Sequence, residues 1–346
     1  MRRSTRYSLL LVLALLGALT IAVVLRKAAP PEAARLLPES DAIAYVTLKP
    51  IRLATHFDRN LVTRSPEYQR FVDATGIVPE RDLDVAAFAL HRMDNPNGPN
   101  GPVGYSEVFE GRFDGQRLAK YLAGMATASE IYDHHTIYTI PIHDGDAVRL
   151  LRIAQLGYDS IAMSNMPTTE QIHSILDRHR SAASPFSGSS LLSARYRDVP
   201  LLSAAWAIGH IGLPFSDRGY IAISGLRLPM PEDTTFVASL RYVGTLHLRI
   251  EEISPTEADA QRSAASLNTL LGLVKSIQQV QPRNASDAAI LQIIGSLKLE
   301  QRKDRAILTA TIPIEALQQL SGTTSQLSPG IQPPEVPAAS RPDSTH

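Results

Sequence analysis

The sequence predicts an α+β protein: an N-terminal transmembrane helix followed by two similar halves of mainly antiparallel sheet, with helices on one face of each sheet. Residues 9–25 form an uncharged, apolar run. Short turns between predicted strands outnumber the long crossovers that parallel strands need, which favours antiparallel pairing. A third observation is a recurring unit in which a strand meets Pro or Asp and a helix follows, at Pro50, Asp114, Pro167, Pro255 and Pro313.

The apolar run at residues 9–25 is predicted to be a transmembrane signal anchor. Three arginines precede it, and Arg26 and Lys27 follow it. Seventeen residues make roughly 25 Å of helix, close to the hydrocarbon thickness of a bilayer. A cleaved signal peptide is the alternative, but the bases and Pro30-Pro31 suit a cleavage site poorly. The charges predict a single-pass protein of the inner (cytoplasmic) membrane, with its large domain outside the cytoplasm.

The domain organisation follows from composition. Residues 1–27 are the predicted anchor, and the proline-containing residues 28–37 are a predicted extended spacer. The first α+β half is expected at residues 38–182 and the second at 196–321, with a boundary in the Ser- and Pro-rich stretch 181–200. Residues 322–346 are rich in Pro, Ser, Thr and Gln and are expected to be a disordered tail.

In the first half, turn and cap residues delimit the elements. Ser65-Pro66-Glu67 predicts the start of a helix that stops at Gly76, and Asp114 predicts the cap of another. Thr168 with Gln171 predicts a capping box. Alternating or continuous apolar runs predict strands at residues 41–48, 83–90, 105–113, 137–142, 149–155 and 160–164.

In the second half, strands are predicted at residues 204–209 and 220–224, followed by a hairpin of 236–243 with 245–253 around Gly244. The longest predicted helix runs from Thr256 to Val280, and its apolar residues at spacings of three and four predict a stripe against a sheet. A helix at 287–294, a hairpin of 297–301 with 307–312, and a short helix at 314–320 complete the half.

Composition excludes several function classes. The chain holds 34 basic and 34 acidic residues, so a nucleic-acid partner has no electrostatic support. Cysteine is absent, which excludes disulfides, thiolate metal sites, a Cys nucleophile and a lipoprotein anchor.

Histidines are the first candidates for a metal site. His134, His135 and His143 with Asp144 and Asp146 are the only local gathering of His and acid. Neighbouring residues on a strand point to opposite faces, so His134 and His135 are not expected to share a metal. His173 and His179, six apart on one predicted helix, share no face either, and no metal, cofactor or catalytic residue is assigned.

Other candidates favour a structural interpretation. The glycine-rich residues 95–102 lack the Lys-Ser/Thr pair of a phosphate loop. Ser187 to Ser190 lack a nucleophile elbow, and Glu251-Glu252 fit a solvated strand end better than a glycosidase pair. Trp206 is expected in the core. Asn284-Ala285-Ser286 matches a glycosylation triplet that is common by chance.

Four stretches, residues 36–46, 65–71, 75–77 and 81–84, together resemble uncharacterised single-pass bacterial envelope proteins with a domain of unknown function built from repeated α+β units. The resemblance is clearest over residues 36–90 and brings no catalytic residues. It implies a periplasmic, membrane-anchored protein of the cell envelope.

The sequence therefore predicts a non-catalytic binding or scaffolding module of the bacterial envelope, held to the membrane through residues 9–25 and able to meet an envelope protein partner. Two alternatives stay open: a hydrolase whose site is assembled from distant residues, and a periplasmic carrier of an apolar ligand. A pocket of ionisable groups would favour the enzyme, and a long apolar cavity the carrier. A filled core with an exposed apolar patch would favour the scaffold.

Overall fold

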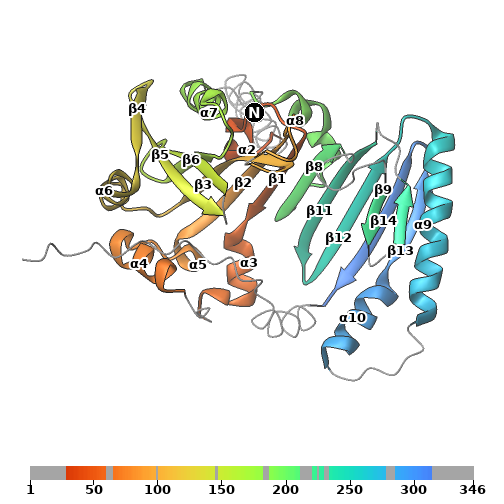
Figure 1. Ribbon diagram of the computed structural model, residues 1–346. Helices are drawn as coiled ribbons and strands as arrows, with labels where there is room; N and C mark the ends of the chain where they lie inside the picture. Colours follow the sequence, from red (N-terminus) through yellow and green to blue (C-terminus); the bar gives the residue numbers. More distant parts are fainter. Residues whose placement is uncertain are drawn as a thin grey trace, which may run out of the picture.

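The computed structural model describes residues 29–59, 65–98, 100–144, 147–181, 187–210, 220–223, 226–229, 234–277 and 285–313. Its centre is one antiparallel sheet of twelve strands (Figure 1). Across the sheet the strands are β13 (Lys298–Arg302), β14 (Arg305–Ile312), β12 (Thr245–Ile253), β11 (Thr235–Val243), β8 (Ala205–His210), β1 (Ala42–Thr47), β2 (Leu83–Arg92), β3 (Val103–Gly111), β7 (Ser160–Ser164), β6 (Ala147–Gln155), β5 (His135–Asp144) and β4 (Ala128–Tyr132). A small separate hairpin pairs β9 (Tyr220–Ile223) with β10 (Leu226–Pro229).

Helices lie on both faces of the sheet. In the first part of the chain they are α2 (Glu32–Leu36), α3 (Leu48–Thr55), the 3-10 turn η1 (Phe57–Arg59), α4 (Pro66–Thr75), α5 (Pro79–Asp82), α6 (Gly115–Met125) and α7 (Glu170–Arg180). Later come α8 (Ser190–Arg195), the 3-10 turn η2 (Tyr196–Asp198), α9 (Glu257–Ile277) and α10 (Ala285–Ser296).

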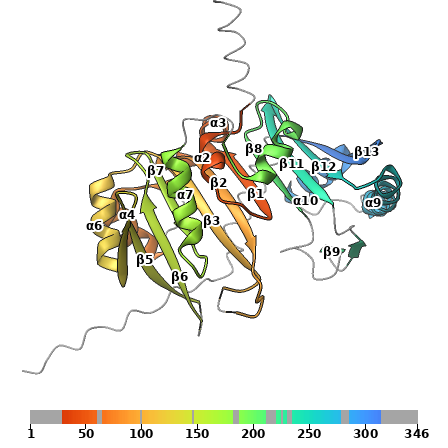
Figure 2. The ribbon, with the colours of Figure 1, turned by 90° about the horizontal axis from the view of Figure 1, so that it is seen from above.

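One face of the central strands, which we call the packed face, is largely buried. Cross-strand register places Ile43, Ala87 and Ile208 on this face, and each is at most 1% exposed. Helices α2, α7 and α8 cover it, and Leu36, Ile175 and Leu192 join the same core cluster, among others. Helices α2 and α7 lie at the top of Figure 1 and in front of the sheet in Figure 2. Burial of these aliphatic side chains is the main source of stability here.

The opposite face, which we call the open face, carries helices mainly at its two ends. At one end a second core cluster joins Leu118 and Leu122 of α6 to Ile153 and Ile161 of the sheet. At the other end α9 and α10 lie against β14, and α9 also contacts β13. Figure 1 shows these two groups at opposite ends of the sheet.

The predicted fold class is wrong in its division of the chain. The two expected sheets are one continuous sheet, because β8 pairs with β1 on one side and with β11 on the other. Tyr45 of β1 stacks on Trp206 of β8 with ring centroids 5.4 Å apart. Strands from both expected halves therefore share hydrogen bonds and a core, and helices cover both faces.

The membrane prediction is corrected as well. Throughout the described residues, no helix combines the length and the apolar character that a membrane crossing requires. Residues 9–25 themselves lie outside that part of the chain. The transmembrane signal anchor and the single-pass inner-membrane localisation that followed from it are therefore withdrawn.

Several local elements match the expected start and stop residues. Ser65 caps α4 by accepting the backbone N–H of Tyr68 at 3.2 Å, and Gly76 ends this helix with φ +75°. Asp114 caps α6. Two stretches differ: residues 28–37, the expected spacer, contain the buried helix α2, and the expected boundary contains α8 and η2. The predicted helix at 314–320 lies outside the described residues.

Candidate ligand-binding face

The centre of the open face holds a row of three alanines on adjacent strands. Ala44 of β1 is directly opposite Ala207 of β8, which is opposite Ala238 of β11. The row continues to Phe88 of β2 on one side and to Ile250 of β12 on the other. We call these five residues the alanine row. At about 4.8 Å per strand, the row runs about 19 Å across the sheet.

Burial alternates along the central strands β8, β11 and β3. In β8, buried Trp206 and Ile208 on the packed face alternate with half-buried Ala205 and Ala207 on the open face, and β11 and β3 repeat the pattern. The half-buried apolar residues of the open face are Ala42, Ala44, Val46, Phe88, Leu90, Phe109, Ala205, Ala207, Phe236, Ala238, Leu240, Leu248 and Ile250. The open face is thus largely apolar and mostly half-buried, whereas most side chains on the packed face of these strands are buried. A contiguous, partly exposed apolar surface of this kind is typical of a binding site.

The strands below the alanine row approach each other closely. A Cβ atom added to Gly209 would lie 2.6 Å from the Cβ atom of Ala42, its cross-strand partner. Any side chain at Gly209 would therefore push β1 and β8 apart. Glycine at this position keeps the strands paired under the half-buried surface.

Glu107 lies at one end of the alanine row. Its cross-strand partners are Phe88 on β2 and Met163 on β7, so its carboxyl is on the open face beside apolar side chains. It forms no hydrogen bond or ion pair with the other described residues. Burial among these neighbours raises the pKa of Glu107 to about 7. The carboxyl is therefore a polar group on the apolar face with no protein partner in the described residues.

Two aromatic side chains beside Glu107 pack against each other. Phe88 and Phe109 form an edge-to-face pair with ring centroids 5.9 Å apart. Tyr105, two positions before Glu107 on β3, has a raised pKa, caused first by burial and then by the charge of Glu107. Sequence reasoning missed Glu107, although an acid between Tyr105 and Phe109 at alternate positions of a predicted strand was a usable signal.

The packed face also contains a buried polar row. The Nε2 atom of His91 is 3.0 Å from the Oγ atom of Ser106, which is 3.1 Å from the Oγ atom of Ser164. A Ser–His contact is the arrangement of a nucleophile and its base. Both serines are fully buried, however, and burial lowers the pKa of His91. No substrate carbonyl can reach Ser106, so the row satisfies buried polar groups rather than performing acyl transfer.

The histidines considered as site candidates do not form one cluster in the structure, and His135 and His173 make structural contacts. Asp133 and His134, both at positive φ, form the turn between β4 and β5, so the two neighbouring histidines do not share a strand. His135 Nδ1 contacts the carbonyl oxygen of Gln155 at 2.8 Å. His173 stacks on Tyr132 with centroids 3.9 Å apart. Within the described residues, no group of His, Asp and Glu could hold a metal ion.

A hollow of about 330 Å³ lies beside this turn, lined by His134, His135, Tyr138 and Tyr158 among others. The ring of His135 is engaged with the Gln155 carbonyl and lies edge-to-face with His179, whose pKa burial lowers. The residues that line this hollow include no Asp, Glu, Lys or Arg.

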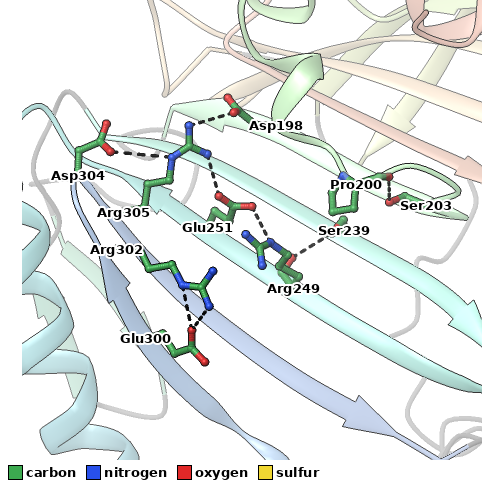
Figure 3. Close-up of polar contacts among 10 residues, drawn as sticks. All are labelled: Asp198, Pro200, Ser203, Ser239, Arg249, Glu251, Glu300, Arg302, Asp304 and Arg305. Atoms are coloured by element: carbon green, nitrogen blue, oxygen red, sulfur yellow. Dashed lines mark hydrogen bonds and ion pairs between the residues drawn. The ribbon is translucent and has the colours of Figure 1, made fainter. Parts of the chain in front are cut away.

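The two neighbouring glutamates point to opposite faces of β12. Glu251, on the packed face, accepts hydrogen bonds from Arg249 at 2.6 Å and Arg305 at 2.9 Å (Figure 3). Glu252, on the open face, accepts from Ser263 of α9 at 2.6 Å, and burial raises its pKa. A glycosidase pair is excluded, because the two carboxyls lie on opposite sides of the sheet.

The remaining candidates are structural. Trp206 is buried, as expected, between Tyr45 and Tyr196. Ser189 caps α8, and Ser190 donates a hydrogen bond to Glu39 at 2.7 Å. The glycine-rich loop leads into strand β3 rather than a helix. Residue 284 of the glycosylation triplet, and Asp146, lie outside the described residues.

Comparisons with known proteins add little. No protein-family model matches the chain, and no curated protein matches it in sequence. Among solved structures, crystal form III of TP0453 is similar with a TM-score of 0.47 and 10% identity, over 85% of this chain and 99% of that one. Crystal forms I and IV of TP0453 give TM-scores of 0.41 and 0.42, each at 10% identity over 84% of this chain and 96% of that one. Similarity at this level carries no functional information.

Proposed function

We propose that this protein is a non-catalytic binding module, and that its open face holds an elongated apolar molecule along the alanine row. The observation that carries the proposal is the half-buried, largely apolar open face of five adjacent strands, opposite a packed face that is largely buried. Leaving apolar area in water costs about 25 cal/mol per Å². A ligand that covers the open face recovers that free energy, which makes binding favourable.

The shape of the surface favours a narrow ligand over a second protein domain. Helices lie over both ends of the open face. The part between them contains the small side chains of Ala44, Ala207 and Ala238. A chain-like molecule lying across the strands touches all three at once. This makes the carrier of an apolar ligand the form of binding module that we favour.

The hydrolase alternative has less support. It would need an accessible nucleophile or a paired acid and base, and the serine and glutamate pairs of the described residues are buried or turned to opposite faces. Protein scaffolding is the remaining alternative, in which the open face meets a partner's side chains instead of a small molecule.

Fluorescence titration with an uncharged, environment-sensitive naphthalene probe tests the proposal. The wild-type protein should bind the probe saturably, with one site per chain. Ala207→Leu, which adds bulk in the middle of the alanine row, should weaken binding by roughly tenfold or more, about 1.4 kcal/mol. Ala265→Leu adds the same bulk at an exposed position of α9 and should bind normally. Equal binding by both variants, or no saturable binding by the wild type, would overturn the proposal.

A further inference from the structure

We infer that the ligand of the open face carries an ammonium group at one end, and that Glu107 binds this group. The inference rests on the proposed function and specifies its ligand: a linear, apolar amine. It stands on three observations about the position and surroundings of Glu107.

The first observation is the register of the sheet. Glu107 is directly opposite Phe88, which is the terminal residue of the alanine row. The carboxyl therefore lies in line with the row, one strand beyond its end. A linear molecule lying on Ala44, Ala207 and Ala238 has its end at Glu107 without bending.

The second observation is the missing partner. Glu107 makes no ion pair or hydrogen bond with any residue that the structure describes. Two buried acids on β12 do have protein partners: Glu251 has two arginines and Glu252 has two serines. Glu107 is half-buried, so its carboxylate loses part of its hydration without gaining a protein partner in the described residues, and a bound cation would compensate for that loss.

The third observation is the aromatic pair beside it. Phe88 and Phe109 lie on the open face on either side of Glu107, one across the strand and one two positions along it. Aromatic faces attract cations as well as apolar groups. Carboxylate and rings together suit an ammonium group at the end of an apolar chain. A carboxylate or phosphate end group would instead be repelled by Glu107.

The test uses three ligands of one chain length that differ only at the end group: n-dodecylamine, n-dodecanol and n-dodecanoate, each below its micelle concentration, at about pH 8, where the amine is charged. Displacement of the naphthalene probe from the full-length protein should rank amine above alcohol above carboxylate, with roughly tenfold between amine and alcohol. Glu107→Gln, which keeps the shape and removes the charge, should bind amine and alcohol alike.

The outcomes separate this inference from the proposed function. If all three ligands displace the probe equally from the wild type, the role of Glu107 is refuted while apolar binding on the open face stands. If the amine keeps its preference in Glu107→Gln, the ammonium group binds elsewhere and the inference is also refuted. Glu300→Gln, an exposed change on β13, controls for the loss of one negative charge. If none of the ligands and no probe binds, the proposed function itself fails.

Discussion

Arg305 and Asp198 lie 107 positions apart in the sequence and are joined by a 3.0 Å hydrogen bond from the guanidinium to the carboxylate. Asp198 belongs to η2, which packs with α8 beside the packed face, and Arg305 is the first residue of β14. The same guanidinium donates to Glu251 at 2.9 Å (Figure 3). The Arg305 guanidinium thus links η2, in the stretch 181–200 that was expected to separate two domains, to strand β12 of the sheet.

Arg305→Ala should destabilise the protein by about 2–4 kcal/mol, because it leaves the buried carboxylate of Asp198 without its closest cation. Urea unfolding followed by circular dichroism measures the change. Arg302→Ala is the matched control on the neighbouring strand: its pair with Glu300 is exposed on both sides, so removing it should cost less than about 1 kcal/mol. Equal losses in the two variants would mean that the Arg305 contacts are energetically no different from a surface pair.

Glu107→Gln should change how stability depends on pH. The carboxyl has an ordinary pKa of 4.5 and a pKa of about 7 in the folded protein. Between these values the folded state holds more protons than the unfolded state, so wild-type stability falls as pH rises through this window. The variant lacks this loss and should be more stable than the wild type above pH 7, by about 1–3 kcal/mol.

Below about pH 4.5 the two proteins should be similarly stable, because the carboxyl is protonated in both states of the wild type. Thermal melts over this pH range provide the measurement. A constant difference at every pH would point to altered packing rather than to the ionisation of Glu107.

Ala264→Leu should destabilise the protein by about 1–3 kcal/mol, because Ala264 is buried where α9 meets the sheet and added bulk forces the two apart. Ala265→Leu, one residue along and exposed, should leave stability unchanged within about 0.5 kcal/mol. Leu271→Ala should cost only about 1–2 kcal/mol, since this side chain is half-buried rather than buried. Denaturant midpoints of the three variants give the comparison, and an unchanged midpoint for Ala264→Leu would contradict the packing of α9.

Ser106→Ala should destabilise the fold by about 1–3 kcal/mol, because His91 and Ser164 both lose a buried hydrogen-bond partner. Probe binding on the open face should not change, since Ser106 points to the opposite face of β3. Unfolding and probe titration on the same preparation test both statements. Loss of binding with stability intact would assign Ser106 a role other than the structural one.

Local elements could be predicted from the sequence because their causes are local. Ser65 and Gly76 set the ends of α4, and alternation located β8 and β11 to within a residue or two. The N-terminus of α7 was misplaced: Thr169, not Thr168, precedes the helix, and its side chain makes no cap hydrogen bond. The apolar stripe of the long helix was partly confirmed, because Ala260 and Ala264 are buried while Leu267 and Leu271 are half-buried.

The arrangement of the elements could not be predicted in the same way. Nothing near Ala42–Thr47 indicates that its second partner strand is Ala205–His210, because this pairing depends on long-range packing such as that of Tyr45 on Trp206. The open face was missed for the same reason: alanine is small enough to suit either a core or a binding surface, and only the register puts three of them in one row.

The position of β1 has a consequence for synthesis of the chain. β1 is complete at residue 47, but its partner on one side, β8, begins at residue 205. At ribosomal rates of about 5–20 residues per second, roughly 8–30 s separate the two events. Until β8 has been synthesised, β1 can pair only with β2. The other edge of β1 then remains unpaired and apolar, and it can pair with strands of other nascent chains. We therefore expect that slowing translation between residues 47 and 205 increases aggregation.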